Sequence, residues 1–316
     1  MAHPIAPSSN GKIPDSDSVY RGSSPRGASI PCFGGERPPT MPRILIFGLG
    51  YSAARIATEL RLKGWEVLST GSAGDFAFDD AASVRLALDG ASHILSSVPP
   101  MADGDPVLLR YGDAIKASGA WLGYLSSTGV YGDTKGAWAD ENAPLLGRRG
   151  GRIEADLAWQ AMSARVFRLP GIYGPGRSGL ERVTEGKAHR IDLPEQVFSR
   201  VHVDDIASGV IAGFTGPPGV YNLADDLPCS QNRVIEFSCD LLGTHWPPLL
   251  GLEDASLSPM ARAFYAENRR VANGKAKRVL GWSPCFPTYE TGLRAVRAIT
   301  SPAIASTPPV TASNVQ

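Results

Sequence analysis

Residues 43–64 read RILIFGLGYSAARIATELRLKG, and this stretch decides the fold. The apolar run at 43–47 is typical of a buried strand, and residues 52–64 carry apolar side chains at helical spacing. Between them, Gly48, Gly50 and Ala53 form a GxGxxA pattern. Such a pattern allows a tight turn, close approach of the backbone to a pyrophosphate, and close packing of helix on strand. Because a helix N-terminus also attracts anions, the stretch predicts a dinucleotide-binding turn, although a turn kept only for packing could have the same pattern.

Short apolar runs alternate with helical patterns along most of the chain. The pattern predicts further strands at 65–70, 76–78, 92–98, 121–127 and 164–169. It predicts helices from about 81, at 105–118 and at 149–162. Alternation of this kind indicates a parallel sheet with helices on both faces. The expected fold class is therefore α/β, a Rossmann-type doubly wound parallel sheet with a small C-terminal substrate lobe.

Composition divides the chain into four expected parts. Residues 1–40 are rich in Ser, Pro and Gly and lack an apolar period, so we expect a disordered leader, with Met41 as a candidate true start. Residues 41–170 form the expected NAD(P)-binding core, and 171–300 a mixed substrate lobe with return elements to the core. Helices are expected there near 230–242, 257–267 and 287–299. The tail, 301–316, resembles the leader in composition, and we expect it to be disordered.

Charge and cysteine content exclude several classes of function. The 316 residues have a formal net charge of zero, which gives no reason to expect nucleic acid or an anionic membrane as partner. The apolar runs are too short to cross a bilayer, so we expect a soluble protein, with a small-molecule substrate as its partner. The cysteine usage favours the cytoplasm. Cys32, Cys229, Cys239 and Cys285 are scattered, which favours reduced thiols and no metal site.

The end of the second predicted strand bears on the choice between NAD and NADP. An acid that binds the adenosine ribose of NAD is usual there. The stretch LSTGSAGD (68–75) instead offers Thr70 and Ser72, with no acid or arginine in place. Hydroxyls without a repelling acid favour NADP slightly. Asp79 lies where the third strand should end, where it could contact the adenine or cap the next helix.

Further segments point to a family. They are SSVPP, YLSSTGVYGD, FRLPGIYGPGR, SRVHVDDIA, VYNLADD and FPTYETGL. With FGLGYSAA they make residues 43–299 resemble the extended short-chain dehydrogenase/reductase superfamily, the NAD-dependent epimerase/dehydratase group. Within that group the chain is similar to an atypical bacterial branch with a GxGYxA turn. The resemblance implies a nicotinamide cofactor, NAD or NADP. Family members often dimerise through helices beside the fifth strand, and the helix at 149–162 is compatible with a homodimer or with core packing.

The resemblance also implies roles for particular residues. Ser127 matches the catalytic Ser/Thr that binds the substrate oxygen, and Tyr131 matches a structural tyrosine of the turn. Arg200 and His202 match the segment that closes the substrate lobe. It puts Ser96 and Ser97 beside the nicotinamide ribose, and Pro170 in the loop that runs along the nicotinamide. Together with the residues of the glycine turn and the ends of the second and third strands, the expected cofactor-binding set is Gly48, Gly50, Tyr51, Ser52, Ala53, Thr70, Ser72, Asp79, Ser96, Ser97 and Pro170.

The usual catalytic pair of the family, YxxxK, is missing. In that pair the lysine lowers the pKa of the tyrosine one helical turn away. Alignment on Asp156 puts Arg148 at the tyrosine position and Arg152 at the lysine position. A guanidinium is a poor proton donor at neutral pH but binds carboxylates and phosphates well. Arg148, Arg152 and Arg200 are therefore candidates for substrate binding, whereas a solvated helix start paired with Glu154 and Asp156 explains the first two equally well.

Two functions remain open from the sequence. The first is an NAD(P)-dependent oxidoreductase or epimerase acting on a small polar or anionic substrate. Its catalytic residues would be Ser127 with Tyr173 or His202 as substitute acid or base. The alternative is a non-catalytic NAD(P)-binding sensor or scaffold protein that has lost the acid/base pair.

Overall fold

The computed structural model describes residues 41–255, 257, 262 and 264–300. These residues belong to one compact unit. The expected leader and tail, and residues 258–261 and 263 of the helix expected near 257–267, lie outside the described residues. The division into a core at 41–170 and a lobe at 171–300 stays a prediction.

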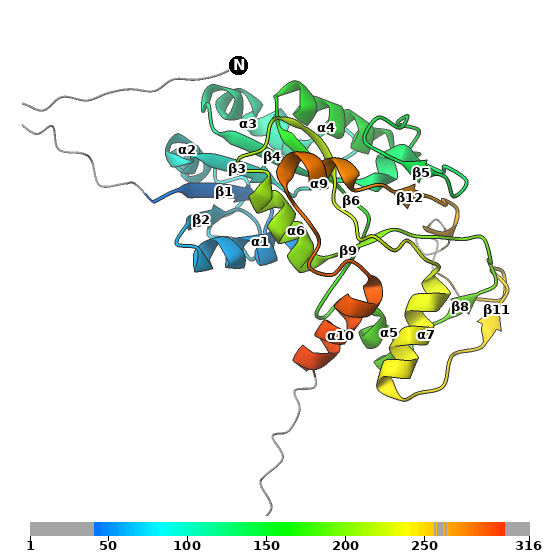
Figure 1. The fold of residues 1–316 in the computed structure, drawn as a ribbon. Helices are drawn as coiled ribbons and strands as arrows, with labels where there is room; N and C mark the ends of the chain where they lie inside the picture. Colours follow the sequence, from blue (N-terminus) through cyan, green and yellow to red (C-terminus); the bar gives the residue numbers. More distant parts are fainter. Residues whose placement is uncertain (1–40, 256, 258–261, 263, 301–316) are drawn as a thin grey trace, which may run out of the picture. The chain divides into compact units, whose positions relative to one another are not determined.

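A six-stranded parallel sheet forms the centre, as the sequence predicts (Figure 1). Its strand order is β10-β6-β4-β3-β1-β2. The strands are β1 (Arg43–Phe47), β2 (Glu66–Ser69), β3 (His93–Ser96), β4 (Trp121–Ser127), β6 (Arg165–Leu169) and β10 (Gly219–Asn222). The register pairs Phe47 with Ser96 and Ser127 with Leu169. The carboxyl ends of the central strands therefore meet at one edge of the sheet.

Helices cover both faces of this sheet (Figure 1). On one face, α1 (Tyr51–Leu62) and α6 (Val203–Ala212) enclose a core that includes Ile46 and Phe167. The other face is covered by three helices whose buried side chains pack with Leu45 and Phe47: α2 (Ala81–Gly90), α3 (Pro106–Ala117) and α4 (Gly150–Ala161). Burial on both faces explains why β1 reads as a continuous apolar run.

The strand predicted at 76–78 does not form a strand of the sheet. Thr70 and Phe76 make a single isolated bridge, which leaves β2 at the edge. Phe78 packs instead against the rings of Phe47 and Tyr111, at 6.3 and 5.5 Å between ring centroids. The Tyr111 hydroxyl donates to the carbonyl of Phe78 at 2.6 Å. Two backbone hydrogen bonds hold Phe76, from the Gly71 N–H at 3.2 Å and to the Ser69 carbonyl at 3.4 Å. The rest of the segment is held by side-chain packing and the Tyr111 hydrogen bond, and the backbone bonds do not continue as a ladder.

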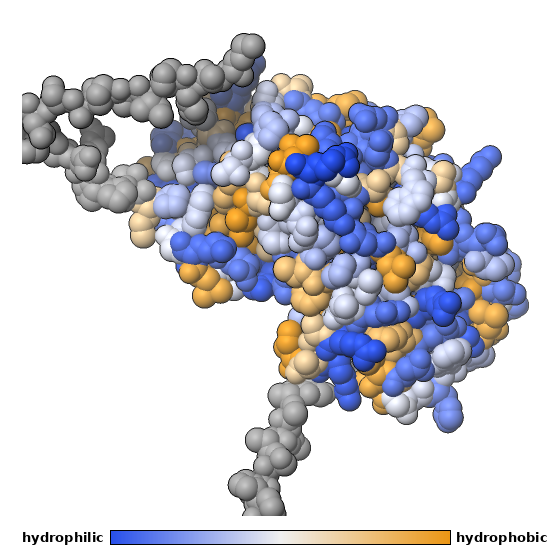
Figure 2. Space-filling view, viewed as in Figure 1, coloured by the Kyte–Doolittle hydropathy of each residue, from blue (hydrophilic) through white to orange (hydrophobic). Residues whose placement is uncertain are grey.

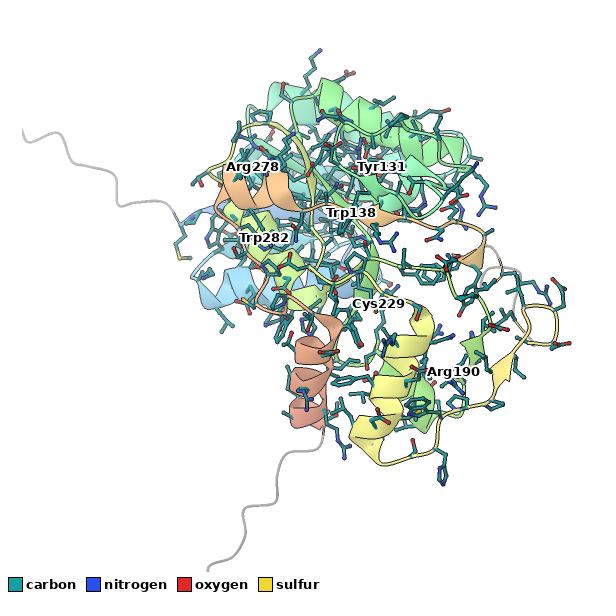
Figure 3. All side chains as sticks on the ribbon, turned by 45° about the vertical axis from the view of Figure 1, so that its right-hand side comes forward. Tyr131, Trp138, Arg190, Cys229, Arg278 and Trp282 are labelled. Atoms are coloured by element: carbon teal, nitrogen blue, oxygen red, sulfur yellow. The ribbon has the colours of Figure 1, made fainter. Side chains whose placement is uncertain are left out.

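The C-terminal half consists of short pieces around a separate apolar cluster. Helices α5 (Gly179–Thr184), α7 (Gln231–Leu242) and α10 (Tyr289–Thr300) meet around Leu180, Val234 and Leu293. Arg190 begins β8 (Arg190–Ile191), which pairs with β11 (Leu249–Leu250), and its side chain lies beside α7 (Figure 3), where it pairs with Glu236 at 2.9 Å. The other small elements are η1 (Thr128–Tyr131), β5 (Trp138–Ala139), β7 (Gly171–Tyr173), β8 (Arg190–Ile191), β9 (Arg200–His202), β11 (Leu249–Leu250), β12 (Arg270–Val271) and α9 (Gly274–Leu280).

The described residues include three cysteines and, on the face seen in Figure 2, a mostly polar surface. On the face shown in Figure 2, polar side chains cover most of the surface, and apolar side chains form separate small patches. No helix within the described ranges combines the length and the apolarity that a membrane span requires. Cys229, Cys239 and Cys285 are free thiols.

Candidate functional site

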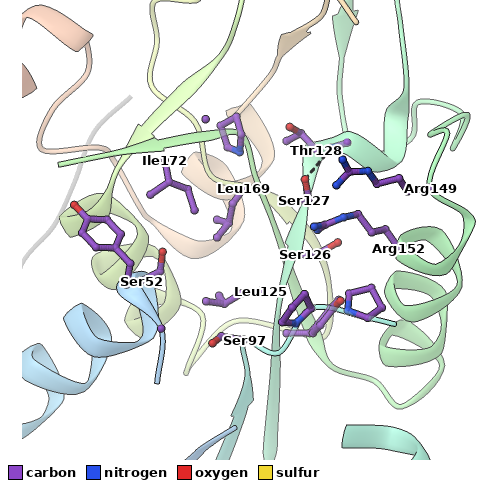
Figure 4. Close-up of a pocket in the computed structure, with 18 of the residues that line it drawn as sticks. Ser52, Ser97, Leu125, Ser126, Ser127, Thr128, Arg149, Arg152, Leu169 and Ile172 are labelled. Carbon is purple, nitrogen blue, oxygen red and sulfur yellow. Dashed lines mark hydrogen bonds between the residues drawn. The ribbon is translucent and has the colours of Figure 1, made fainter. Parts of the chain in front are cut away.

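A cavity of about 700 Å³ opens at the carboxyl edge of the sheet. Residues after β1, β3, β4 and β6 line it, together with the first turns of α1 and α4 (Figure 4). Its volume is in the range of small-molecule and cofactor sites. The edge at which the cavity lies is where open α/β sheets bind ligands.

The glycine turn forms one wall of the cavity region. Gly48 has a φ of +82°, and a Cβ there would lie 3.0 Å from Cγ2 of Val98. The Gly48 N–H donates to Oγ1 of Thr70 at 3.2 Å, and Oγ of Ser97 donates to the Gly48 carbonyl at 2.6 Å. Thr70 and Ser97, both expected at the cofactor, thus fix the conformation of the turn. Only glycine fits at position 48 without strain.

The N-terminus of α1 faces the cavity without a capping side chain. Gly50 is the N-cap residue and makes no side-chain cap, and a Cβ added to it would meet nothing within 4 Å. Ala53 is fully buried, as close packing of helix on strand requires. The guanidinium of Arg177 lies 5.7 Å from the ring of Tyr51, on the cavity wall. Open helix amides beside a cation fit the pyrophosphate of a dinucleotide.

The end of β4 contributes two serines with different partners. Oγ of Ser126 donates to Asp156 at 2.6 Å, so its proton is engaged. Oγ of Ser127 accepts from the Gly129 N–H at 3.1 Å. An accepting hydroxyl keeps its own proton for donation, and Ser127 lines the cavity. The hydroxyl of Ser127 can therefore donate to an oxygen of a bound substrate.

Arginines at the start of α4 form the opposite wall. Arg149 and Arg152 reach from α4 toward Ser126, Ser127 and Thr128 (Figure 4). No carboxylate within the described ranges forms an ion pair with either of them. Arg148 also lines the cavity, is 56% exposed and pairs with Glu267 at 3.0 Å. Sequence reasoning included Arg148 and Arg152 but missed Arg149, which directly precedes the helix.

The predicted partners of these arginines are engaged elsewhere. Asp156 is fully buried and accepts two hydrogen bonds from Arg168, at 2.7 and 3.0 Å. It also accepts from Ser126 and Gln160, both at 2.6 Å. Four donors saturate a carboxylate, so Asp156 has no capacity left for Arg152. The sequence left open whether Arg148 and Arg152 bind a substrate or pair with acids of their own helix. The structure does not contain a pair of either arginine with Asp156.

Glu267 is the carboxylate that lines the cavity. It accepts from Arg148 at 3.0 Å and from Arg269 at 2.7 Å. Burial alone would raise the pKa of Glu267, but the hydrogen bonds and charges of Arg269 and Arg148 outweigh burial and lower it. Glu267 is therefore ionised near neutral pH. Neither Glu267 nor Arg269 could be recognised from the sequence, because they join the site across more than a hundred residues.

Tyr173 and His202, the expected substitute acid and base, do not line the cavity. The Tyr173 hydroxyl donates to the carbonyl of Thr288 at 3.4 Å, and burial raises its pKa. His202 caps α6, with Nδ1 accepting from the Asp204 N–H at 3.2 Å, and burial lowers its pKa. The two rings pack edge to face at 5.1 Å. Both side chains therefore lie in the packing beneath the C-terminal half.

Tyr131 belongs to a buried network below the site. Its hydroxyl donates to Oδ1 of Asn222 at 2.7 Å and accepts from Arg168 at 3.0 Å. The side chain is 1% exposed. These contacts agree with the structural role that the family resemblance implies.

The remaining predicted residues divide into two groups. Those that line the cavity are Gly50, Tyr51, Ser52, Ala53, Ser97 and Pro170. Ser72 and Asp79 are exposed outside it, Ser96 is fully buried, and the cap of α2 is Asp80 and not Asp79. Arg200 is buried among the carbonyls of Phe198, Cys229 and Ser230, at 3.0 to 3.3 Å, and not at the cavity. In the part of the chain that the structure describes, no cluster of His, Cys, Asp and Glu could hold a metal ion.

Comparison with known proteins places the chain among related folds. No family model matches it. A conserved protein of unknown function from Silicibacter pomeroyi is 40% identical, with 82% of this chain and 99% of that one covered and a TM-score of 0.74. A Streptomyces protein, 3-diazoavenalumate denitrifying reductase, is 29% identical over 180 residues. The match covers 49% of this chain and 57% of that reductase, so the chain spans little more than half of this curated relative.

More distant structural neighbours are NAD-dependent epimerases and dehydratases. The ADP-L-glycero-D-manno-heptose-6-epimerase of Helicobacter pylori is 15% identical, with 82% and 96% of the chains covered and a TM-score of 0.67. The dTDP-glucose 4,6-dehydratase of Bacillus anthracis, solved in complex with NAD, is 16% identical, with 81% and 95% covered and a TM-score of 0.65. At these identities the likeness establishes the shared fold.

Proposed function

Because the chain belongs to one family with the Silicibacter pomeroyi protein and has the fold of NAD-dependent epimerases and dehydratases, we propose that it is an NAD(P)-dependent oxidoreductase or epimerase. Its substrate is a small anionic molecule. One observation carries this proposal: the uncapped N-terminus of α1, the hydroxyl of Ser127 and the arginines of α4 line the same cavity.

The cavity offers distinct places for cofactor and substrate. The amides at the start of α1, with Arg177 beside them, would hold the pyrophosphate, and Ser97 and Pro170 would lie along the nicotinamide half. The bound nicotinamide would supply or accept the hydride. Ser127 would donate a hydrogen bond to the substrate oxygen, and Arg149 and Arg152 would bind the anionic group.

In this arrangement, no side chain that lines the cavity has to supply the proton that accompanies hydride transfer. Glu267 is ionised, and the hydroxyl of Tyr51 is engaged with the carbonyl of Pro175 at 3.0 Å. Burial also raises the pKa of Tyr51. We propose that the proton which balances hydride transfer to a carbonyl comes from water, while Ser127 stabilises the developing oxyanion.

A slight preference for NADP remains part of the proposal. Asp75, a carboxylate just beyond β2, is turned back onto Ser69, whose N–H and hydroxyl both donate to it at 2.8 Å. The exposed Ser72 is then the free side chain of this loop that could donate to a 2′-phosphate. Parallel fluorescence titrations with NADH and NADPH measure the preference.

A second function is favoured by the positions of Tyr173 and His202 outside the cavity wall. A protein that binds NAD(P) without an acid or base in its site could act as a redox sensor or scaffold. Saturable NAD(P)H binding with no turnover on any member of a broad panel of anionic carbonyl compounds and nucleotide sugars would select this alternative.

The test of catalysis is Ser127→Ala in the full chain. We expect kcat/KM for the best substrate of the panel to fall roughly 100-fold, because a hydrogen bond to the developing oxyanion is lost. The Kd for NAD(P)H should not change. Ser127→Thr keeps the hydroxyl and serves as the matched control. Equal turnover of wild type and Ser127→Ala would contradict the role of Ser127.

A further inference from the structure

The charge on the cavity wall is unusually one-sided. Of the residues that the structure describes, five arginines and one glutamate line the cavity, with formal charges that sum to +4: Arg148, Arg149, Arg152, Arg177, Arg269 and Glu267. The glutamate is already bound by two of these arginines. The whole chain, by contrast, has a formal net charge of zero. Positive charge is therefore concentrated where a ligand would bind.

The excess charge divides between the two ends of the cavity. At the α1 end, Arg177 and the open helix amides would face the two charges of the cofactor pyrophosphate. At the α4 end, Arg149 and Arg152 face the cavity, and no carboxylate of the described ranges forms an ion pair with them. Asp156, the acid one helical turn beyond Arg152, is saturated by Arg168, Ser126 and Gln160.

The start of α4 adds to this positive potential. Arg149 is the N-cap residue and makes no side-chain cap, and Gly150 and Gly151 follow it. The first turn therefore carries bare amides and two guanidiniums, with no acidic residue in it. A single carboxylate would neutralise one of the two guanidiniums and leave the other unpaired in a partly enclosed site.

We infer that the α4 end of the cavity binds a dianionic group, a phosphate monoester or a pair of carboxylates, next to the reacting carbon of the substrate. This inference rests on the proposed function, because it takes Ser127 as the group that binds the reacting oxygen. Arg149 and Arg152 extend toward Ser127 itself (Figure 4), so the dianionic group lies within a few bonds of that oxygen. The substrate class is thus a small dianion, and not a nucleotide sugar with its diphosphate in the C-terminal half.

The inference is tested on the full-chain apoprotein, without cofactor, by isothermal titration calorimetry at constant ionic strength. Malonate and inorganic phosphate are the dianion probes, and acetate is the monoanion. We expect at least one dianion to bind at least ~10-fold more tightly than acetate, and the tighter one tells whether carboxylates or a phosphate are preferred. Arg149→Gln and Arg152→Gln should each weaken dianion binding ~10-fold, the effect of losing one charge-assisted contact.

Two control variants separate this site from other positive regions. Arg85→Gln removes an exposed charge on α2, outside the cavity, and should leave dianion binding unchanged. Arg177→Gln alters the α1 end, and the part of dianion binding that depends on Arg149 and Arg152 should persist in it. Binding that is lost in Arg177→Gln but kept in Arg152→Gln would overturn the inference, because the anion would then occupy the pyrophosphate site. Equal affinity for acetate and the dianions, or no binding of either dianion, would overturn it as well.

The outcome is independent of the proposed enzymatic function. Dianion binding that depends on Arg149 and Arg152, in a protein that fails to bind NADH or NADPH, would sink the proposed function and keep the anion site. NAD(P)H binding without dianion binding would do the reverse. UDP-glucose binding that is insensitive to Arg149→Gln and Arg152→Gln would favour a nucleotide-sugar substrate and contradict the small dianion.

Discussion

Arg168 and Arg152 are chemically identical side chains on either side of Asp156, yet their environments are opposite. Arg168, on β6, is 2% exposed and makes a two-pronged contact with Asp156 and a bond to Tyr131. Arg152 lies four residues before Asp156 on α4 but forms no ion pair with it. Instead it faces the cavity. One arginine joins β6 to α4, and the other lines the cavity, where we propose that it binds a ligand.

The difference shows how an ion pair suggested by helical spacing is overridden by the core. An acid and a base four residues apart on a helix surface normally attract each other. Asp156 points inward to the sheet, where the hydrogen bonds of Arg168 offset the cost of burying its charge. Arg152 points to the open side of the same helix. Burial decides which arginine takes the carboxylate.

The largest expected effect comes from removing Arg168. Arg168→Met leaves the buried carboxylate of Asp156 without its cation, so we expect the free energy of unfolding to fall by about 3–5 kcal/mol. Arg152→Met, the matched control on the same helix, should change it by no more than about 0.5 kcal/mol. Urea denaturation of both variants measures this difference. Similar losses of stability in the two variants would break the comparison.

A second buried carboxylate, Asp225, should make the stability of the protein depend on pH. Asp225 is 2% exposed and, unlike Asp156, forms no ion pair with any residue of the described ranges. Burial raises its pKa to about 7. The native state thus keeps a proton on Asp225 that the unfolded chain releases near pH 4. Between about pH 4 and 7 the native state binds more protons, so this group makes stability fall as pH rises through that window.

Asp225→Asn removes the charge that burial disfavours. We expect the stability advantage of the variant over the wild type to grow by about 2–3 kcal/mol between pH 5 and pH 8, because most of the titration window lies between these two values. Urea denaturation at the two pH values measures the effect. Asp113→Asn, at an exposed position on α3, is the control for the loss of one negative charge. A stability gain of equal size at both pH values would mean that Asp225 is not protonated in the native state.

The parallel sheet and the glycine turn were predicted from the sequence, because the signals of their strands and helices are local. RILIF, the GxGxxA turn and the apolar spacing of the following helix fall within 22 residues, and the structure has the corresponding elements there. The strand expected at 76–78 failed, because Phe76 and Phe78 had the composition of a strand but their rings serve the core below β2. Composition does not distinguish these two uses.

Several residues that line the cavity could not be predicted from the sequence. Ser127 was found because it precedes a recognisable turn, and Arg152 because it lies where a family lysine is expected. Arg149, Arg177, Glu267 and Arg269 reach the cavity through contacts between distant segments. Their signals, GPGR and ENRR, are short charged stretches that equally suit a solvated loop. Only the fold shows that they converge.

The smallest expected change in stability belongs to Gly50, one of the residues proposed to bind the cofactor. Gly50 is the N-cap of α1, and space is open beyond its Cα atom. Aspartate is a preferred N-cap residue, so Gly50→Asp should leave the free energy of unfolding unchanged or raise it by roughly 0–1 kcal/mol. Its carboxylate would occupy the amides proposed for the pyrophosphate and repel that anion. Stability and cofactor binding should therefore respond in opposite directions.

The most direct test of the account is a fluorescence titration of wild type and Gly50→Asp with NADH and NADPH, alongside urea denaturation of both. Saturable binding by the wild type, lost in a Gly50→Asp variant that is at least as stable, is the predicted result. Absence of saturable binding by the wild type, or unchanged affinity in Gly50→Asp, would contradict the assignment of this cavity to a nicotinamide dinucleotide.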